Sequence, residues 1–374
     1  MASARAAIEK LLAKADITIG GDRAWDIMVT DERLFRRVLA GGTLAAGESY
    51  MDGWWDASAL DEFFAHALQA KLYRSMITPA VIYQTILSRL FNRQSRSRAS
   101  QVAEEHYDLG NDLYKAMLDK RMIYTCAYWS ATTAPRDLDE AQEAKLDLVC
   151  RKIGLKKGDR VLDIGCGWGG FAQFATERYG ASVVGITVSK EQFALAQERC
   201  KGLPIELRLQ DYRDVHEQFD HIVSIEMFEA VGYKNFREYF KVAARCLKDD
   251  GLFLLQTIGS HKSVTTTDAW INKYIFPNGA LPSMQQIAKA IEDLFVMEDV
   301  HNFGADYDRT LMEWFKNFDA AWPKLKETYG GDRFYRMWKY YLLQCAGSFR
   351  SRNISDWQIV LSKRGVPGGY AGVR

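Results

Sequence analysis

The fold is decided by the stretch Val161-Leu162-Asp163-Ile164-Gly165-Cys166-Gly167-Trp168-Gly169-Gly170. A short apolar run contains an acidic residue near its end, passes into a glycine-rich turn and continues into residues 171–176, whose apolar spacing is typical of a helix. A strand, a tight loop and a helix N-terminus in this order hold a nucleotide-like ligand at the carboxyl edge of a parallel sheet. Glycine in the loop lets the backbone approach such a ligand where a Cβ would clash.

Two classes of ligand are compatible with this loop. Gly165, Gly167 and Gly170 satisfy the G-x-G-x-x-G spacing of dinucleotide-binding dehydrogenases. Asp163, however, stands before the first glycine, where a carboxylate attracts a cationic ammonium group and repels a pyrophosphate. We therefore favour S-adenosylmethionine, and a dinucleotide remains the alternative from this stretch alone.

The bulk composition is that of a globular protein with a large core. Of 374 residues, 48% are hydrophobic and 26% are charged, and the net charge is +1. With so small a net charge, the chain as a whole has no electrostatic attraction to nucleic acid or to a membrane. We therefore predict no nucleic-acid partner and only local attraction to a membrane. The six cysteines are scattered without a C-x-x-C pair, which predicts free thiols and no metal site. Since neither a signal-like N-terminus nor a run of 18 apolar residues is present, we expect a cytoplasmic protein that does not span a membrane.

Changes in composition divide the chain into three parts. Residues 1–85 have their own apolar faces and glycine punctuation, which predicts a small α+β domain. Its first helix is expected to pack on the core of this domain, with contact to lipid or membrane as the alternative. Residues 86–104 carry several arginines among serine, asparagine and glutamine. They form either a solvated linker or a basic patch that binds anionic headgroups with about 1 kcal/mol per basic residue. Residues 105–374 form the larger, catalytic domain, with lipid-binding insertions.

Short elements are expected in the first domain. Apolar spacing predicts an amphipathic helix over residues 6–15, a strand over 25–29 and a helix over 60–70. A further helix over 34–39 is expected to end at Gly41-Gly42.

Strands and helices alternate through the larger domain, which predicts an α/β fold with a doubly wound parallel sheet. The expected strands are 161–164, 182–187, 205–209, 221–224 and 252–256, and the expected helices are 138–153, 171–176, 190–200 and 236–246.

In such a sheet the ligand lies across the carboxyl ends of the strands. Thr187 and Gln192 are placed for ribose hydroxyls, and Asp211 can accept a hydrogen bond from an adenine amino group or act instead as a helix cap. The second strand does not end in the acidic residue that binds the ribose in dehydrogenases, which counts against that class. The expected cofactor-binding residues are Tyr124, Thr125, Asp163, Gly165, Cys166, Gly167, Thr187, Val188, Gln192, Asp211 and Tyr212.

The chain resembles the cyclopropane fatty acid synthases, which share a fold and methyl donor with the mycolic acid cyclopropane synthases. The resemblance runs over nearly the whole chain and is carried by residues 47–55, 105–111, 126–129, 270–277, 302–307 and 344–350 in addition to the glycine loop. It implies a class I S-adenosylmethionine-dependent methyltransferase fold, with a Rossmann-like sheet.

The resemblance also implies a reaction. The sulfonium methyl is added to a cis double bond of a phospholipid acyl chain, and a proton is lost from that methyl to close a cyclopropane ring. Such chemistry requires an aligned alkene, exclusion of water from the carbocation and a base at the methyl group. Three alternatives remain: a methyl-branched or otherwise modified acyl chain, a small-molecule methyltransferase and a non-catalytic lipid-binding protein.

For the base, the resemblance implies a bound bicarbonate ion. Its expected holders are Cys126, Glu229, Gln256, the backbone of Ile258 and Tyr307. The sequence departs from well-known members of the family because Gln256 and Ala230 replace histidines and Glu226 replaces a glycine. A glutamine amide can donate to an anion but cannot titrate, and a second carboxylate there must point elsewhere or be the base itself.

Two further expectations come from the resemblance. Cys345 corresponds to a cysteine sometimes assigned as the catalytic thiol, although alkene methylation needs no sulfur nucleophile and a buried helical cysteine is the alternative. The expected partners are a phospholipid membrane surface, an unsaturated acyl chain and a second copy of the chain, with peripheral association at the inner face of the membrane.

Overall fold

The computed structural model describes residues 3–79, 110–130 and 134–374, together with positions 83, 85, 88, 92 and 94. Most of the basic segment expected at 86–104 therefore lies outside the described residues, and the domain boundary near residue 85 stays a prediction. Contacts divide the chain into two compact units. Unit 1 comprises Met1–Phe91, Thr266–Pro277 and Tyr307–Ile354, and unit 2 comprises Asn92–Thr265, Asn278–Asp306 and Ser355–Arg374.

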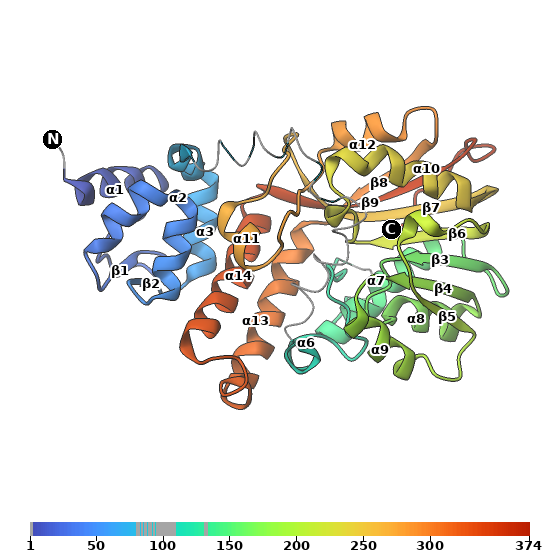
Figure 1. The fold of residues 1–374 in the computed structure, drawn as a ribbon, viewed down its shortest axis with the longest axis horizontal. Coiled ribbons are helices and arrows are strands. Elements are labelled where there is room, and N and C mark those ends of the chain that lie inside the picture. Colours follow the sequence, from blue (N-terminus) through green and yellow to red (C-terminus); the bar gives the residue numbers. More distant parts are fainter. Residues whose placement is uncertain are drawn as a thin grey trace. The chain divides into compact units, whose positions relative to one another are not determined.

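Unit 1 is mainly helical and is assembled from three separate segments of the chain (Figure 1). Its short strands β1 (Ile27–Val29) and β2 (Trp55–Ala57) pair antiparallel. Helix α14 packs on α2 and α3, and α11 packs on α2. The helices are α1 (Ala4–Leu12), α2 (Arg33–Met51), α3 (Leu60–Gln69), α11 (Ala269–Tyr274), α13 (Ala305–Leu325), whose first residues belong to unit 2, and α14 (Asp332–Arg350), with 3₁₀ turns η1 (Ala13–Ala15) and η2 (Leu72–Met76).

The expected end of a helix at Gly41-Gly42 is wrong. Helix α2 continues to Met51 and is kinked at Gly42, whose φ of 61° and ψ of −142° are not helical. A Cβ at Gly42 would lie 2.5 Å from the carbonyl oxygen of Met76. Glycine therefore bends this helix and lets η2 approach its backbone, instead of ending it.

Arg350 joins distant segments within unit 1. Its Nη1 lies 2.6 Å from Asp61 Oδ2 and 2.7 Å from Glu62 Oε1, both in the first turn of α3. Its Nε and Nη2 donate to both carboxylate oxygens of Asp308 at 2.9 Å. One guanidinium in the last turn of α14 thus holds α3 and α13 together by charge-assisted hydrogen bonds.

Unit 2 is built on a seven-stranded sheet with the order β5-β4-β3-β6-β7-β9-β8 (Figure 1). The pairs from β5 to β7 are parallel, whereas β8 and β9 pair antiparallel. The predicted doubly wound α/β sheet is confirmed, and β8 and β9 are additions that the sequence did not predict. The strands are β3 (Arg160–Ile164), β4 (Ser182–Thr187), β5 (Ile205–Leu209), β6 (Phe219–Ile225), β7 (Leu247–Ser260), β8 (Val296–Asn302) and β9 (Ile354–Ser362). The helices are α6 (Asn111–Met117), α7 (Leu138–Lys152), α8 (Gly170–Tyr179), α9 (Lys190–Arg199), α10 (Phe236–Cys246) and α12 (Met284–Ile291), with 3₁₀ turns η4 (Tyr212–Asp214), η5 (Phe228–Ala230) and η6 (Tyr233–Asn235).

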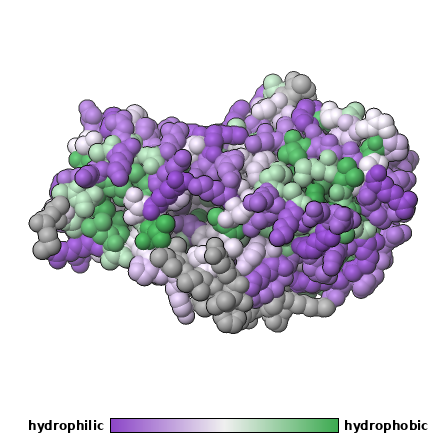
Figure 2. Space-filling view, turned by 90° about the horizontal axis from the view of Figure 1, so that it is seen from above, coloured by the Kyte–Doolittle hydropathy of each residue, from purple (hydrophilic) through white to green (hydrophobic). Residues whose placement is uncertain are grey.

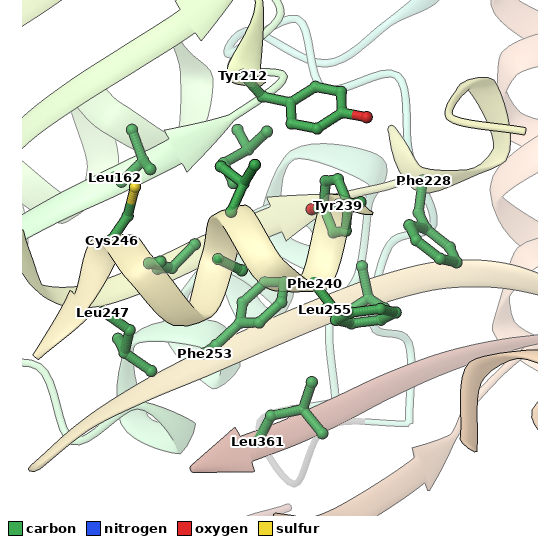
Figure 3. Close-up of a cluster of buried hydrophobic side chains, with 14 of the residues drawn as sticks. Leu162, Tyr212, Phe228, Tyr239, Phe240, Cys246, Leu247, Phe253, Leu255 and Leu361 are labelled. Carbon is green, nitrogen blue, oxygen red and sulfur yellow. The ribbon is translucent and has the colours of Figure 1, made fainter. Parts of the chain in front are cut away.

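The sheet is buried on both faces, and most residues along its central strands are apolar. Along β3, Leu162 and Ile164 join one hydrophobic cluster and Val161 joins the other, as the two-residue period of a strand requires. The first cluster lies beneath α10 and α12, and the second lies beneath α7 and α8. Figure 3 shows Phe240 of α10 packed near Phe253 of β7 in the first cluster. Burial of each such side chain contributes about 1.5–3 kcal/mol, which fixes the strand ends that form the site.

Candidate active site

The glycine loop after β3 follows a buried carboxylate. Asp163 is 2% exposed, and no described residue donates a hydrogen bond to its Oδ2. Burial raises the pKa of Asp163 to about 7, and Lys145 opposes this shift. A buried carboxylate oxygen without a partner is costly unless a ligand supplies one. The position therefore fits the ammonium group of the predicted cofactor.

The loop itself adopts a conformation that depends on glycine. Gly165 has a φ of 87°, and a Cβ there would lie 2.6 Å from Cγ of Met227. The N–H groups of Gly165 and Cys166 both donate to the carbonyl oxygen of Ile186 at 3.0 Å, which fixes the loop against the end of β4. At Gly167, with a φ of 54°, no described atom lies within 4 Å of a Cβ position. The loop is therefore open on the side where a ligand would approach.

The residues after β4 are brought together as expected for a ribose site. Thr187 and Gln192 are both buried, and the Thr187 hydroxyl donates to Gln192 Oε1 at 3.2 Å. Ser189 caps α9 by accepting a hydrogen bond from the Gln192 N–H. Val188 lies between these polar residues in sequence and is half-buried. The cap fixes Gln192 beside Thr187, where both can face one ligand.

Asp211 has local partners in the structure. Its Oδ1 accepts from the Arg213 N–H at 2.9 Å and its Oδ2 from Arg213 Nη1 at 2.8 Å, so it is the N-cap of the 3₁₀ turn η4. Tyr212 is buried, and the Arg213 guanidinium lies over its ring at 4.8 Å. Each carboxylate oxygen keeps a second lone pair, so the cap leaves capacity for an adenine amino group.

A second group of polar residues lies at the ends of β6, β7 and β9. We call Glu226, Glu229 and Asp356 the carboxylate cluster. Gln256 links two of its members, because its Nε2 lies 2.9 Å from Glu226 Oε1 and 3.0 Å from Asp356 Oδ2. The Cys126 N–H donates to the same Oε1 of Glu226 at 2.8 Å. Gln256 and Asp356 are fully buried, so this part of the network is shielded from water, whereas Glu226 is partly exposed.

The third carboxylate is held by the backbone of β7. Glu229 Oε1 accepts from the Ile258 N–H at 2.5 Å and from the Thr257 hydroxyl at 2.9 Å. Burial first, and then Glu226, raises the pKa of Glu229 to about 8. Burial, followed by the charges of Glu226 and Glu229, also raises the pKa of Asp356 well above its usual range. Both shifts favour the protonated forms of Glu229 and Asp356.

A buried lysine connects the two groups. Lys145 of α7 is fully buried and donates to Thr125 Oγ1 at 2.6 Å. Burial lowers the pKa of Lys145, and Glu226 is the strongest of the acidic groups that oppose this effect. Thr125 is a predicted cofactor residue, and the neighbouring Tyr124 ring packs edge-on against Tyr114 at 5.2 Å. Lys145 thus interacts electrostatically with Asp163 of the cofactor loop and with Glu226 of the carboxylate cluster.

Comparison with known proteins identifies the family. Residues 94–359 match the family described as mycolic acid cyclopropane synthetase. The chain belongs to this family.

Individual relatives cover most of the chain. It is 54% identical over 363 residues to the cyclopropane-fatty-acyl-phospholipid synthase of Escherichia coli (strain K12), covering 96% of this chain and 93% of that protein. It is 34% identical over 354 residues to the tuberculostearic acid methyltransferase UfaA1 of Mycobacterium tuberculosis (strain ATCC 25618 / H37Rv), covering 90% and 82%. The mycolic acid cyclopropane synthase CmaA1, solved in complex with SAH and CTAB, is similar with a TM-score of 0.65 and 31% identity over 71% of this chain and 98% of that chain. The predicted class I methyltransferase fold is confirmed.

The bicarbonate site expected from the family does not fit the residues present. Of the donors assigned to the ion, the amide of Gln256 donates to Glu226, and the N–H of Ile258 donates to Glu229. The backbone N–H of Cys126 also donates to Glu226, and burial raises the pKa of its thiol well above the usual range. An anion here would meet donors already used and three carboxyl groups.

Two expected residues of the family belong to unit 1. Tyr307 stacks on Phe349 with ring centroids 4.5 Å apart and packs edge-on against Trp314 at 5.8 Å. Cys345 lies in α14, and burial raises the pKa of its thiol to about 12. The thiol is therefore protonated at neutral pH and is a poor nucleophile.

The sequence did not point to Lys145, Asp356 or Gln358. Asp356 and Gln358 lie two residues apart in β9 and are both fully buried. Gln358 Nε2 donates to Gln256 Oε1 at 3.0 Å. The signal was present as polar residues at alternate positions of an otherwise apolar run, which in a buried strand indicates a polar network.

Proposed function

We propose that this chain transfers a methylene from S-adenosylmethionine to the cis double bond of unsaturated phospholipid acyl chains and so forms a cyclopropane ring. The observation that carries the proposal is the 54% identity, over 96% of the chain, to a protein named cyclopropane-fatty-acyl-phospholipid synthase. The glycine loop and the buried acid before it support the same chemistry, because they suit a ligand with a cationic amino-acid end.

The cofactor would be held by Asp163, by the backbone of the glycine loop, and by Thr187 and Gln192. The unpaired Asp163 oxygen and the open side of Gly167 support this placement. When bound, S-adenosylmethionine supplies an electrophilic methyl group on a sulfonium. The chain orients the donor, excludes water through its buried polar network and accepts the proton released on ring closure.

A second product class has its own support. UfaA1, a relative at 34% identity, is named a tuberculostearic acid methyltransferase. In this chain Glu226 and Gln256 stand where well-known cyclopropane synthases have glycine and histidine, so the groups around the reacting carbon differ. A methyl-branched or otherwise modified acyl chain would arise if the proton left the acyl chain instead of the new methyl group.

The proposed partner surface is a phospholipid membrane, and the proposed location is the cytoplasmic face. In unit 1, Ile77 is 59% and Tyr73 is 36% exposed, beside the exposed Lys71 and Arg74. Aromatic, aliphatic and basic side chains together suit an anionic bilayer surface. Figure 2 shows hydrophobic residues at the surface among mostly hydrophilic ones. Among the described residues, no helix is long and apolar enough to cross a membrane. A homodimer remains a proposal from the family.

The decisive experiment is incubation of the purified protein with labelled methyl donor and vesicles of monounsaturated phospholipid, followed by mass spectrometry and NMR of the lipids. We expect a gain of one CH₂ with loss of the olefinic signal and appearance of cyclopropane protons. A gain of CH₂ that keeps an olefinic signal would support the branched product. Untouched lipid together with methylation of a water-soluble acceptor would overturn the proposal.

A further inference from the structure

Glu226 occupies two of the hydrogen-bond donors that the family resemblance assigned to bicarbonate. Its Oε1 accepts from the Cys126 N–H at 2.8 Å and from Gln256 Nε2 at 2.9 Å. Its own N–H donates to the carbonyl oxygen of Gln256 at 2.8 Å, which continues the pairing of β6 with β7. The side chain therefore enters the site from the end of β6.

The backbone at Glu226 is in an unfavourable conformation. Its φ of 52° lies in the left-handed region, which favours glycine over residues with a Cβ. Such strain persists where the surrounding contacts hold it, and it is common at functional sites. At Glu226 the strained backbone conformation holds a carboxylate side chain within the polar network.

The charges of the cluster distinguish Glu226 from its neighbours. Three carboxyl groups close together cannot all ionise, and Glu229 and Asp356 are the two whose burial favours the protonated form. Glu226 accepts two N–H groups, which favour its charged form, and Lys145 supplies positive charge nearby. Glu226 is also partly exposed, whereas Asp356 is fully buried, so Glu226 can exchange a proton.

We propose that the Glu226 carboxylate is the base that removes the proton in this reaction, in place of a bound bicarbonate, and that Gln256 and Asp356 position it. The inference rests on the proposed function and adds to it the identity of the base.

The step is balanced as follows. Once an alkene carbon has accepted the methyl group, one C–H bond of that methyl breaks. The electron pair of this bond forms the C–C bond that closes the ring, and the proton passes to Glu226. The positive charge of the lipid and the negative charge of Glu226 disappear together, and the Glu226 carboxylic acid then releases its proton to water.

The test compares turnover on unsaturated phospholipid vesicles in buffer freed of carbon dioxide and in the same buffer with added bicarbonate. The parent protein is expected to turn over equally in both. Glu226→Gln keeps the shape but removes the base, so turnover falls by about 10²–10⁴-fold in both buffers. Glu226→Gly suits the positive φ and releases the Cys126 and Gln256 donors, so it is expected to be inactive without bicarbonate and to regain activity when bicarbonate is added.

Two controls separate this role from a structural one. Glu206→Gln, at an exposed ion pair with Arg208 on β5, is expected to leave turnover unchanged. Asp356→Asn keeps an oxygen that accepts from Gln256 and is expected to keep turnover, whereas Asp356→Leu lowers kcat without changing the KM for S-adenosylmethionine. Calorimetry with S-adenosylhomocysteine verifies that each variant is folded.

Bicarbonate dependence of the parent, or full activity of Glu226→Gln, would overturn this assignment of the base. Equal loss of kcat in Asp356→Asn and Asp356→Leu would overturn the positioning role. A parent protein that modifies no lipid in either buffer would overturn the proposed function and, with it, this base.

Discussion

The ammonium group of Lys145 lies 2.6 Å from the hydroxyl of Thr125, which is partly buried. Lys145 is fully buried, and its charge acts on Asp163 of the cofactor loop and on Glu226 of the carboxylate cluster. One cation thus acts on both halves of the site.

Lys145→Met is therefore expected to weaken cofactor binding. Without the nearby positive charge the pKa of Asp163 rises further, and the protonated acid cannot pair with a ligand ammonium group. A rise of about one pKa unit corresponds to roughly tenfold weaker binding of S-adenosylhomocysteine at pH 7, measured by calorimetry. The exposed Lys157→Met serves as the control. Unchanged affinity in Lys145→Met would show that Asp163 does not depend on this cation.

Cofactor affinity is expected to depend on pH through Asp163. Burial raises the pKa of Asp163 to about 7, so below that pH the carboxyl is mostly neutral and above it mostly ionised. Binding of S-adenosylhomocysteine should therefore tighten as pH rises from 5.5 to 8, by up to about tenfold per unit below the pKa. Asp163→Asn should bind more weakly and lose this dependence, and a pH profile that is the same in both proteins would contradict the assignment.

Cofactor affinity should rise with pH, whereas the contribution of Glu229 to the stability of the protein should fall with pH. The pKa of Glu229 is about 8 in the folded protein against an ordinary value of 4.5, so its stabilising protonation is fully present below about pH 4.5 and is lost as pH rises through 8. Glu229→Gln cannot ionise and is expected to be more stable than the parent at pH 9, by roughly 1–3 kcal/mol, with little difference at pH 4.5. Thermal unfolding followed by circular dichroism at the two pH values measures this. The control Glu206→Gln should gain no stability at pH 9. If it gains as much as Glu229→Gln, the gain does not come from the burial of Glu229.

Membrane binding is expected to depend on Ile77. Ile77→Ser removes an exposed aliphatic side chain near Lys71 and Arg74 in sequence, so cosedimentation with anionic vesicles should decrease several-fold. Met28→Ser is a matched control, because Met28 is 58% exposed against 59% for Ile77. Lys71→Gln should weaken binding at low salt more than at high salt. Equal loss in the Ile77 and Met28 variants would argue against a localised membrane contact.

The central sheet could be predicted because its strands are simple in composition. Strands β4 and β5 have the bounds expected from the sequence. Strand β4 is an apolar run buried on both faces, and β5, at the edge of the sheet, alternates apolar with charged residues. Strand β8 has no such run, because its two valines and one methionine stand among charged and polar residues. Strand β9 buries Asp356 and Gln358, and its polar residues at alternate positions hide it from a search for apolar runs.

The candidate site could be predicted only in part, for a related reason. The glycine loop is local, and its residues are adjacent in sequence. The hydrogen bonds of Glu226 join residues 100 and 30 positions away, Cys126 and Gln256, and such contacts exist only after the sheet has formed. The sequence flagged Glu226 and Gln256 as unusual, but it could not show that they bind each other.

The ion pairs of Arg350 have a consequence for biosynthesis. Asp61 and Glu62 leave the ribosome almost 300 residues before the arginine that neutralises them, and at about 5–20 residues per second the delay lasts tens of seconds. During that time the early helices lack their partners from α14, and the nascent chain is a substrate for chaperones. Truncated products that end before α14 should consequently be degraded faster than the complete chain.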